Sequence, residues 1–494
     1  MKNYKYITSI VLTMMILVSC QDFAELEQNK NLPTSVPPSV VIRSILIDLT
    51  NDGWSDEHRW NQFWASNYNY YETNEYWTTG DFNYITLKNV IEMEKEALKR
   101  DAGKVNPYNA LGKFFRAYFF VSMTQKFGDI PMGEALLGLK DEFPKFDNQR
   151  DVFKASLQYL EEANTDLTSL INSGDNSLSG DFYYSNDLKK WQKAVNSFKL
   201  RVLINLSKKE ADAELSVKAK FAEVINNPTK YPLFSGMADN MEFVHNGITN
   251  KYPFNQDEFG KIATRYNMSA TYLNALVVLK DPRTFVVAEP AKALVTAGKT
   301  GVDAYYGAPS GQNLDDMSVD ALNGKISFPN KARYFTNYIG ENTIQIGYSE
   351  QCFNIAEAIN RGWVTGDAKT YYENGIKGSM SFYGITDATA LSTYLAQGTV
   401  AYTNDAAGLT KILTQKYLAF FQNSGLEAYY NYRRTGVPTF NEGPGTGAAN
   451  NFKIPRRFQY PVNERRTNAA NYNTAITNQF NGADPLNMDL WILK

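Results

Sequence analysis

The sequence predicts a mostly α-helical fold, in which tetratricopeptide-like helix pairs form a scaffold and a large, irregular, loop-rich region packs on it. Apolar residues recur at intervals of three and four in five segments, the pattern of a buried helix face, and a sixth segment, 109–127, is apolar nearly all round. Two of these segments are separated by only Val364-Thr365, as expected for a helix pair, although no strict 34-residue repeat is present. Between the helices, residues 228–265, 284–348 and 436–485 are rich in Gly, Asn, Pro and Tyr and show little periodicity. Loops of this length are usually functional or disordered.

Residues 1–19 have the features of a lipoprotein signal peptide. Lys2 and Lys5 precede an apolar run over 7–18 that is too short to cross a bilayer. The run closes on Leu17-Val18-Ser19-Cys20, which resembles a bacterial lipobox. We therefore expect cleavage before Cys20 and lipid attachment to its thiol. The alternative is an ordinary signal peptide that is cut elsewhere.

Residues 20–40 are predicted to be a lipid-anchored tether. Asn, Pro and Gln dominate this segment, and Pro33, Pro37 and Pro38 disfavour regular structure. A flexible tether would let an anchored domain stand off the bilayer. The remaining residues, 41–494, are long enough to bury a large core.

Residues 54–84 hold the densest aromatic cluster of the chain. Trp60, Trp64, Tyr68 and Tyr71 recur at three and four, which predicts the buried face of a helix. Trp54, Tyr70 and Trp77 do not follow this helical spacing. A second aromatic site is the adjacent pair Tyr305-Tyr306 in the Gly-rich stretch 301–311, since adjacent rings in a loop cannot both be assigned to the core by periodicity. Exposed rings can stack on the CH-rich faces of sugars, which removes apolar area from water at about 25 cal/mol per Å². The rings that we expect to form one exposed ligand cradle are Trp54, Tyr70, Trp77, Tyr305 and Tyr306.

The six predicted helices follow in order along the chain. In the third of them, Trp191, Phe198 and Val202 share one apolar stripe and should be buried. Cys352 lies on the stripe of the fourth and is expected to be a buried apolar residue and not a nucleophile. The predicted ranges are 109–127, 149–171, 187–206, 349–363, 366–377 and 409–422.

Composition argues against several functional classes. A net charge of −2 and a pI of about 6.0 make nucleic acid an unlikely partner. His58 and His245 are the only histidines, so no zinc site, cofactor or histidine-based catalysis is predicted. Motifs for a nucleophile elbow or a phosphate-binding loop are absent from the sequence. Glycoside hydrolysis by a carboxylate pair stays open, although Glu72, Glu75 and Asp81 are better explained as surface acids.

Several segments together resemble the SusD/RagB family of Bacteroidetes outer-membrane lipoproteins, and more narrowly its SusD-like branch of starch-binding relatives. Any one of these segments alone is weak evidence for the family, but their occurrence in this order along the chain is strong evidence. They are Lys126-Phe127-Gly128-Asp129-Ile130-Pro131, Trp191 with Asn196-Ser197-Phe198-Lys199-Leu200-Arg201, Asp281-Pro282-Arg283, Ala356-Glu357-Ala358 with Arg361-Gly362, Gln415-Lys416-Tyr417, Tyr432-Arg433-Arg434-Thr435-Gly436-Val437-Pro438, and Ile454-Pro455-Arg456-Arg457-Phe458-Gln459-Tyr460-Pro461 with Glu464 and Asn468.

The resemblance implies a single SusD-like domain over 41–494 and a surface protein that captures oligosaccharides. It also implies a partner, a TonB-dependent SusC-like β-barrel transporter, to which the ligand is delivered. A peptide or glycopeptide ligand, a surface glycoside hydrolase and a protein-binding scaffold remain as alternatives. Binding residues vary within this family and are not carried over, and the shared motifs look structural. Arg433-Arg434 is accordingly expected to bind helix-end carbonyls and carboxylates of the protein itself and not to form a site for an anionic ligand.

Overall fold

The helix boundaries follow capping residues in the sequence. In the computed structural model, which describes residues 35–70, 72–100 and 103–494, α6 (Pro107–Phe127) starts after Asn106. The Asn106 side chain accepts a hydrogen bond from the Asn109 N–H at 3.0 Å, and Gly128 ends the helix with φ 94°. Asp187 caps the start of α8 (Leu188–Asn205) in the same way. Residues Pro38–Lys494 form one compact unit.

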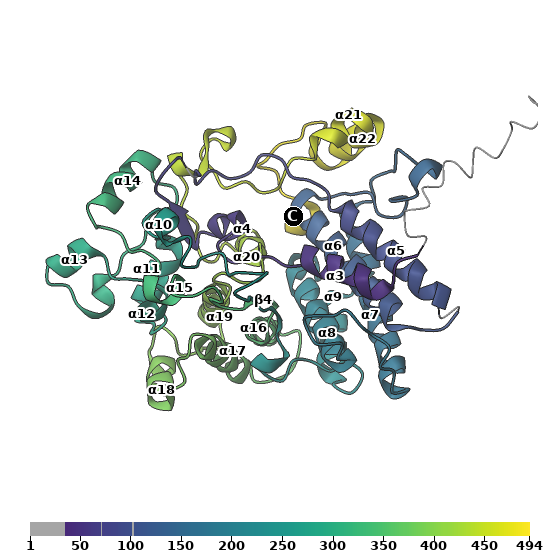
Figure 1. Ribbon diagram of the computed structural model, residues 1–494, viewed down its shortest axis with the longest axis horizontal. Coiled ribbons are helices and arrows are strands. Elements are labelled where there is room, and N and C mark those ends of the chain that lie inside the picture. Colours follow the sequence, from purple (N-terminus) through teal and green to yellow (C-terminus); the bar gives the residue numbers. More distant parts are fainter. Residues whose placement is uncertain (1–34, 71, 101–102) are drawn as a thin grey trace, which may run out of the picture. The chain divides into compact units, whose positions relative to one another are not determined.

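The first group of helices packs in sequence order, each against the next. Helix α6 is apolar nearly all round and is covered by α5 and α7, and α7 in turn packs on α8 (Figure 1). The predicted ranges 109–127, 149–171 and 187–206 are confirmed to within two residues at each end. The helices of this group are α3 (Pro38–Asp48), α5 (Tyr84–Arg100), α6, α7 (Gln149–Asn172), α8 and α9 (Val217–Asn226), whereas the short α4 (Asp56–Trp60) packs on the strand that follows it and lies outside the group.

The second group is centred on α16 (Tyr348–Asn360), which packs on α17 (Ala368–Phe382) and α19 (Ala406–Ala419). Gly362, with φ 73°, follows α16 and sets the short turn into α17. The predictions of these three helices are confirmed, with ends shifted by one to five residues. The remaining members are α18 (Ala388–Ala396), which we did not predict, and α20 (Glu427–Thr435).

The loop-rich segments contain short helices and two small antiparallel sheets. Strand β1 (Trp64–Ser66) pairs with β3 (Tyr266–Met268), and β2 (Met241–Phe243) pairs with β4 (Thr343–Ile346) across a register irregularity. The α-helices here are α10 (Phe259–Ile262), α11 (Ala270–Val278), α12 (Thr284–Val287), α13 (Lys292–Thr296), α14 (Leu314–Leu322), α15 (Lys331–Tyr334), α21 (Val462–Thr467) and α22 (Ala469–Phe480). The 3₁₀ turns are η1 (Gly138–Lys140), η2 (Ser207–Lys209), η3 (Met237–Asp239), η4 (Gly301–Ala304), η5 (Pro444–Thr446), η6 (Ala448–Asn450) and η7 (Trp491–Leu493).

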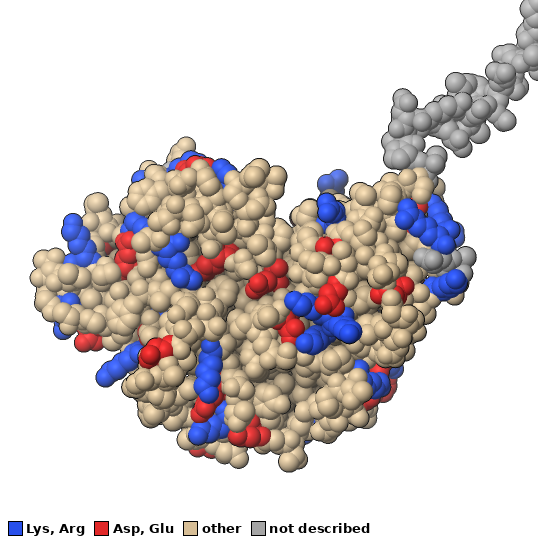
Figure 2. All heavy atoms as spheres, turned by 60° about the horizontal axis from the view of Figure 1, so that its bottom comes forward, with Lys and Arg blue, Asp and Glu red and all other residues tan. Residues whose placement is uncertain are grey.

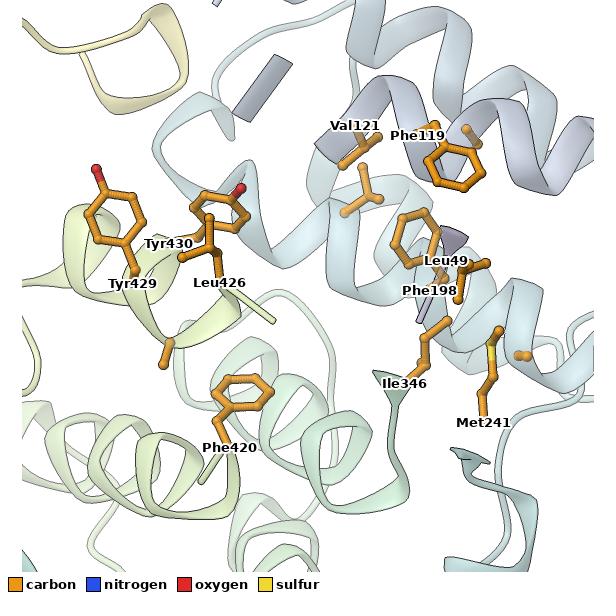
Figure 3. Packing of buried hydrophobic residues seen from close by; sticks show 14 of the residues in the cluster. Leu49, Phe119, Val121, Phe198, Met241, Ile346, Phe420, Leu426, Tyr429 and Tyr430 are labelled. Atoms are coloured by element: carbon orange, nitrogen blue, oxygen red, sulfur yellow. The ribbon is translucent and has the colours of Figure 1, made fainter. Parts of the chain in front are cut away.

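The two helix groups meet in one apolar core reinforced by buried ion pairs. Figure 3 shows Phe119 of α6, Phe198 of α8 and Ile346 of β4 contributing to this core. On the polar side of α8, the Arg201 guanidinium binds Glu350 of α16, with Nε to Oε1 at 2.6 Å. Both side chains are almost fully buried, so removing either one would leave the charge of the other buried and unpaired.

The Arg433-Arg434 pair is structural, as predicted. Arg434 of α20 binds Glu357 of α16, with Nη2 to Oε2 at 2.8 Å. Arg433 donates to the carbonyls of Gln125 and Arg456 at 2.7 and 2.8 Å. The arginine pair therefore ties three segments of the chain together.

The structure corrects two expectations in the N-terminal part. Pro38 begins α3 and does not block it, because the first helical position needs no N–H donor. The aromatic helix through Trp60, Trp64 and Tyr68 is also wrong: α4 ends at Trp60 and Trp64 lies on β1. Gln62 takes φ 56°, which breaks the helical path. Cys20 and most of the tether lie outside the described residues.

In the part of the chain that the structure describes, no helix has the length and apolar character needed to cross a bilayer.

Candidate ligand-binding surface

The chain after β1 is tied back to the end of that strand by Asn74. Strand β1 pairs with β3 in the register Trp64–Met268 to Ser66–Tyr266. Asn74 then closes the loop, since its side chain accepts from the Ser66 N–H and donates to the Ser66 carbonyl, both at 2.8 Å. These two hydrogen bonds tie Asn74 to the end of β1.

This loop presents two tyrosine rings to solvent. Tyr70 is 80% exposed and Tyr68 is 38% exposed. Their ring centroids lie 6.2 Å apart at an angle of 36°. The Arg265 guanidinium lies 4.2 Å from the centroid of Tyr68, a cation–π distance that restrains the ring. We call Tyr68, Tyr70 and Arg265 the tyrosine platform.

Side chains of β1, β3 and α4 pack together next to this loop. Trp64 and Tyr266 face each other across the β1–β3 sheet, with ring centroids 4.2 Å apart. Arg59 binds Glu72 and lies over Trp64 at 5.5 Å from its ring. Burial raises the pKa of Glu72, and the Arg59 charge opposes this rise. Glu72 is therefore engaged in an ion pair within the fold.

The structure brings the second predicted segment, 301–311, next to the first. The Met268 carbonyl of β3 accepts from the Ala308 N–H at 2.8 Å, while Met268 also pairs with Trp64. Ala270 donates back to the Ala308 carbonyl at 2.7 Å. Gly307 is required here, because a Cβ would lie 2.6 Å from the backbone of Ala270. Residues 64–66 and 306–308 are therefore joined through β3.

The rings of the second segment differ in exposure. Tyr306 is 46% exposed, whereas Tyr305 is half-buried. Tyr305 packs edge-on against Phe285 of α12, with centroids 5.6 Å apart. A role for Tyr305, Tyr306 and Tyr70 in ligand binding stays a prediction.

The expectation of exposed rings at Trp54 and Trp77 is wrong, because both are buried. Trp54 stacks on Phe254 at 4.0 Å, and its indole N–H donates to the Tyr252 hydroxyl at 2.8 Å. Trp77 stacks on Phe458 at 4.0 Å and 2°. Both rings lie off the helical spacing because they pack against distant loops and not because they face solvent.

Tyr68 and Arg265 are platform residues that we did not predict. We assigned Tyr68 to a buried helix face from its spacing alone. The signal against that helix was the interleaving of tyrosines with Asn67, Asn69 and Asn74, since Asn favours turns over helix interiors. No local signal distinguishes Arg265.

The remaining titratable candidates are buried or paired. Burial lowers the pKa of His58 to about 3 and raises the pKa of the Cys352 thiol to about 12. Cys352 is buried, as predicted. Among the described residues, no group of three or more His, Cys, Asp or Glu could hold a metal ion.

On the face shown in Figure 2, blue and red side chains are interspersed, so this face lacks the extended basic area typical of a nucleic-acid surface.

Comparison with known proteins gives consistent matches over nearly the whole chain. Residues 30–461 match the SusD-like family, described as starch-binding and associating with the outer membrane. A SusD homologue from Bacteroides fragilis is 30% identical, with a TM-score of 0.84 over 93% of this chain and 100% of that chain. An outer-membrane protein from Bacteroides vulgatus, described as involved in nutrient binding, is 31% identical with a TM-score of 0.81 over the same shares. No curated protein matches the chain.

A more distant structure shares the fold. A chitin-binding SusD homologue from Flavobacterium johnsoniae is 21% identical, with a TM-score of 0.74 over 92% of this chain and 98% of that chain. The helical scaffold is therefore similar across relatives of widely different sequence.

Proposed function

The chain belongs to the SusD-like family, and on this premise we propose that it is a lipid-anchored outer-membrane protein that captures oligosaccharides at the cell surface. It then delivers them to a TonB-dependent, SusC-like β-barrel transporter. Cys20 carries the anchor in this proposal. The protein acts by binding and not by catalysis, in keeping with the family description, which names binding and no reaction.

The observation that carries the proposal is the tyrosine platform. Tyr68 and Tyr70 expose ring area from a loop that is fixed by β1 and by Asn74. Rings already held in place lose little conformational freedom when a ligand binds, which favours affinity. The flat face of a ring matches the CH-rich face of a pyranose, and Arg265 beside it can donate hydrogen bonds to hydroxyl groups.

The second segment can widen this surface. Residues 306–308 are joined to β1 through β3, and Tyr306 is exposed. A platform with rings from both segments would contact several sugar units, which suits an oligosaccharide better than a monosaccharide. Buried Trp54 and Trp77 take no part in it.

Titration with maltohexaose and chitohexaose tests the proposal, since starch and chitin are the ligands named for the family and for one relative. We expect one of these probes to bind the mature chain and Tyr70→Ala to weaken that binding about tenfold. The matched control is Phe143→Ala, which removes an exposed ring from the loop between α6 and α7 and should change nothing. Full affinity of Tyr70→Ala and Tyr306→Ala for a bound glycan would contradict the platform. Binding of neither glycan, with enrichment of peptides from a library, would favour the peptide alternative.

A further inference from the structure

A cavity lies where the end of α6, the start of α7, helix α22 and the C-terminal turn η7 meet. Its volume is about 430 Å³, which is within the range of small-molecule sites, ~300–1,000 Å³. It shares no residue with the tyrosine platform. Asp129, Asn478 and Trp491 are the lining residues that could recognise a ligand.

Asp129 supplies a largely buried carboxyl group to this cavity, with one of its two oxygens engaged within the fold. It is only 8% exposed, and one carboxyl oxygen accepts from the Gln149 N–H at 2.8 Å. No described residue donates to the other oxygen. Burial raises the pKa of Asp129 to about 7, so at neutral pH the group can either accept or donate a hydrogen bond. The oxygen that no described residue satisfies is therefore available to a hydroxyl group of a ligand in the cavity.

Trp491 and Asn478 complete the recognition groups. The Trp491 ring is half-buried, and the Lys209 ammonium lies 4.7 Å from its centroid. Within the described part of the chain, no group accepts from the Trp491 indole N–H. The exposed Asn478 amide on α22 likewise makes no hydrogen bond to a described residue. A partly exposed indole whose N–H has no described acceptor, an exposed amide, and a carboxyl group with one oxygen that no described residue satisfies suit a polyhydroxylated ligand.

The charges around the cavity favour a neutral ligand. Arg150 at its rim is bound to Asp212, with Nε to Oδ2 at 2.6 Å and Nη2 to Oδ1 at 3.0 Å. The Lys494 ammonium is 3.4 Å from the Gln479 carbonyl, and its charge offsets that of Asp129. No single sign of charge therefore dominates the rim.

We propose that this cavity is a second carbohydrate site, in which a neutral pyranose ring packs on Trp491 and its hydroxyls bind Asp129 and Asn478. The site goes beyond the proposed capture at the tyrosine platform and does not depend on it. A protein that captures long glycans gains avidity when two sites on one rigid unit engage the same chain.

Oxidative footprinting of Trp491 tests the site directly. The mature protein is exposed to hydroxyl radicals with and without maltohexaose or chitohexaose at millimolar concentration, and modification of each peptide is measured by mass spectrometry. We expect one of the two sugars to lower the oxidation rate of Trp491 at least about threefold, as for a ring covered by a stacked ligand. An unchanged rate at Trp491 with both sugars would overturn the proposal.

Variants separate the cavity from the platform. Asn478→Ala should abolish the protection of Trp491, whereas the matched control Asn473→Ala, on the same helix and outside the cavity lining, should keep it. Tyr70→Ala at the platform should also keep it. Loss of protection in Tyr70→Ala but not in Asn478→Ala would assign the effect to the platform and refute the second site.

Discussion

At the scale of the residue, the role of an aromatic ring is decided by what packs on its two faces. Tyr70 and Trp77 are seven residues apart, and neither fits a helical stripe. Tyr70 keeps most of its surface in solvent, whereas Trp77 is enclosed by Phe458, Trp60 and Tyr429, with centroid distances of 4.0, 4.8 and 4.9 Å. The two rings should therefore respond to substitution in opposite ways.

Truncation of Trp77 should destabilise the fold and not merely weaken binding. We expect Trp77→Ala to lower the free energy of unfolding by about 3–5 kcal/mol, because the stacked and edge-on contacts are lost and a cavity remains. Urea denaturation measures this change. Tyr70→Ala in the same assay should change the stability by less than about 0.5 kcal/mol. Equal melts for Trp77→Ala and the wild type would show that the ring is not part of the core.

Asp129 should make stability depend on pH in a direction opposite to that of most carboxylates. Its pKa rises from 3.8 to about 7 on folding because burial disfavours the charged form. The unfolded chain therefore releases this proton at lower pH than the folded one, and stability is lost as pH rises from about 4 through 7.

Asp129→Asn should remove this dependence, since the amide oxygen can still accept from the Gln149 N–H. The difference in unfolding free energy between variant and wild type should shift in favour of the variant by up to about 1.4 kcal/mol per pH unit over that range. Urea melts at pH 5, 6, 7 and 8 give the difference. Parallel curves for the two proteins would mean that the Asp129 pKa is the same in both states.

At the scale of the element, α8 is the helix that connects the two helix groups. Its apolar stripe holds Trp191, Phe198 and Val202, which are buried as predicted. Its polar side carries Arg201, which binds Glu350 of α16. One helix thus supplies both the packing surface for α6 and the ion pair to the second group.

Trp191→Ala should lower the free energy of unfolding by about 3–5 kcal/mol, as for other large aromatic deletions in cores. The ring packs on Phe114 and Phe115, and its N–H donates to Asp181 at 3.0 Å. Trp191→Phe keeps much of the volume and loses the hydrogen bond, so it should cost less, about 1–3 kcal/mol. A loss below about 1 kcal/mol for Trp191→Ala in a denaturant melt would contradict the burial.

At the scale of the whole molecule, the proposed function requires an anchor that lies outside the described residues. The chain has two cysteines, of which Cys352 is buried in α16 and Cys20 closes the lipobox-like sequence. The lipid anchor of the proposed function would therefore have to be carried by Cys20.

Cys20→Ser should release the protein from membranes, because serine cannot form the thioether to a diacylglycerol. Fractionation of cells with immunodetection measures the distribution. The matched control Cys352→Ala removes the other thiol and should stay in the membrane fraction. Quantitative retention of Cys20→Ser in the outer membrane would rule out lipid attachment at this residue, and protease treatment of intact cells reports whether the domain faces the exterior.

The sequence alone was sufficient for features that depend on near neighbours. The helices at 109–127, 149–171 and 187–206 follow from apolar spacing and caps, and both are local properties. The structural role of Arg433-Arg434 was also predictable, since an arginine pair at the end of a helix near carboxylates and carbonyls is satisfied within the fold. The family was predictable as well, because its short motifs occur in a specific order along the chain.

Only the tertiary structure decided which rings outside the helices face solvent. The Trp54 backbone N–H donates to the side-chain oxygen of Gln422, 368 residues further along the chain. The Trp77 indole N–H donates to the carbonyl of Arg457, 380 residues away. No periodicity near either tryptophan records such distant partners. The same holds for Arg265, which reaches Tyr68 because β3 pairs with β1. In irregular chain, burial is determined by long-range packing, so it becomes visible only when the segments are folded together.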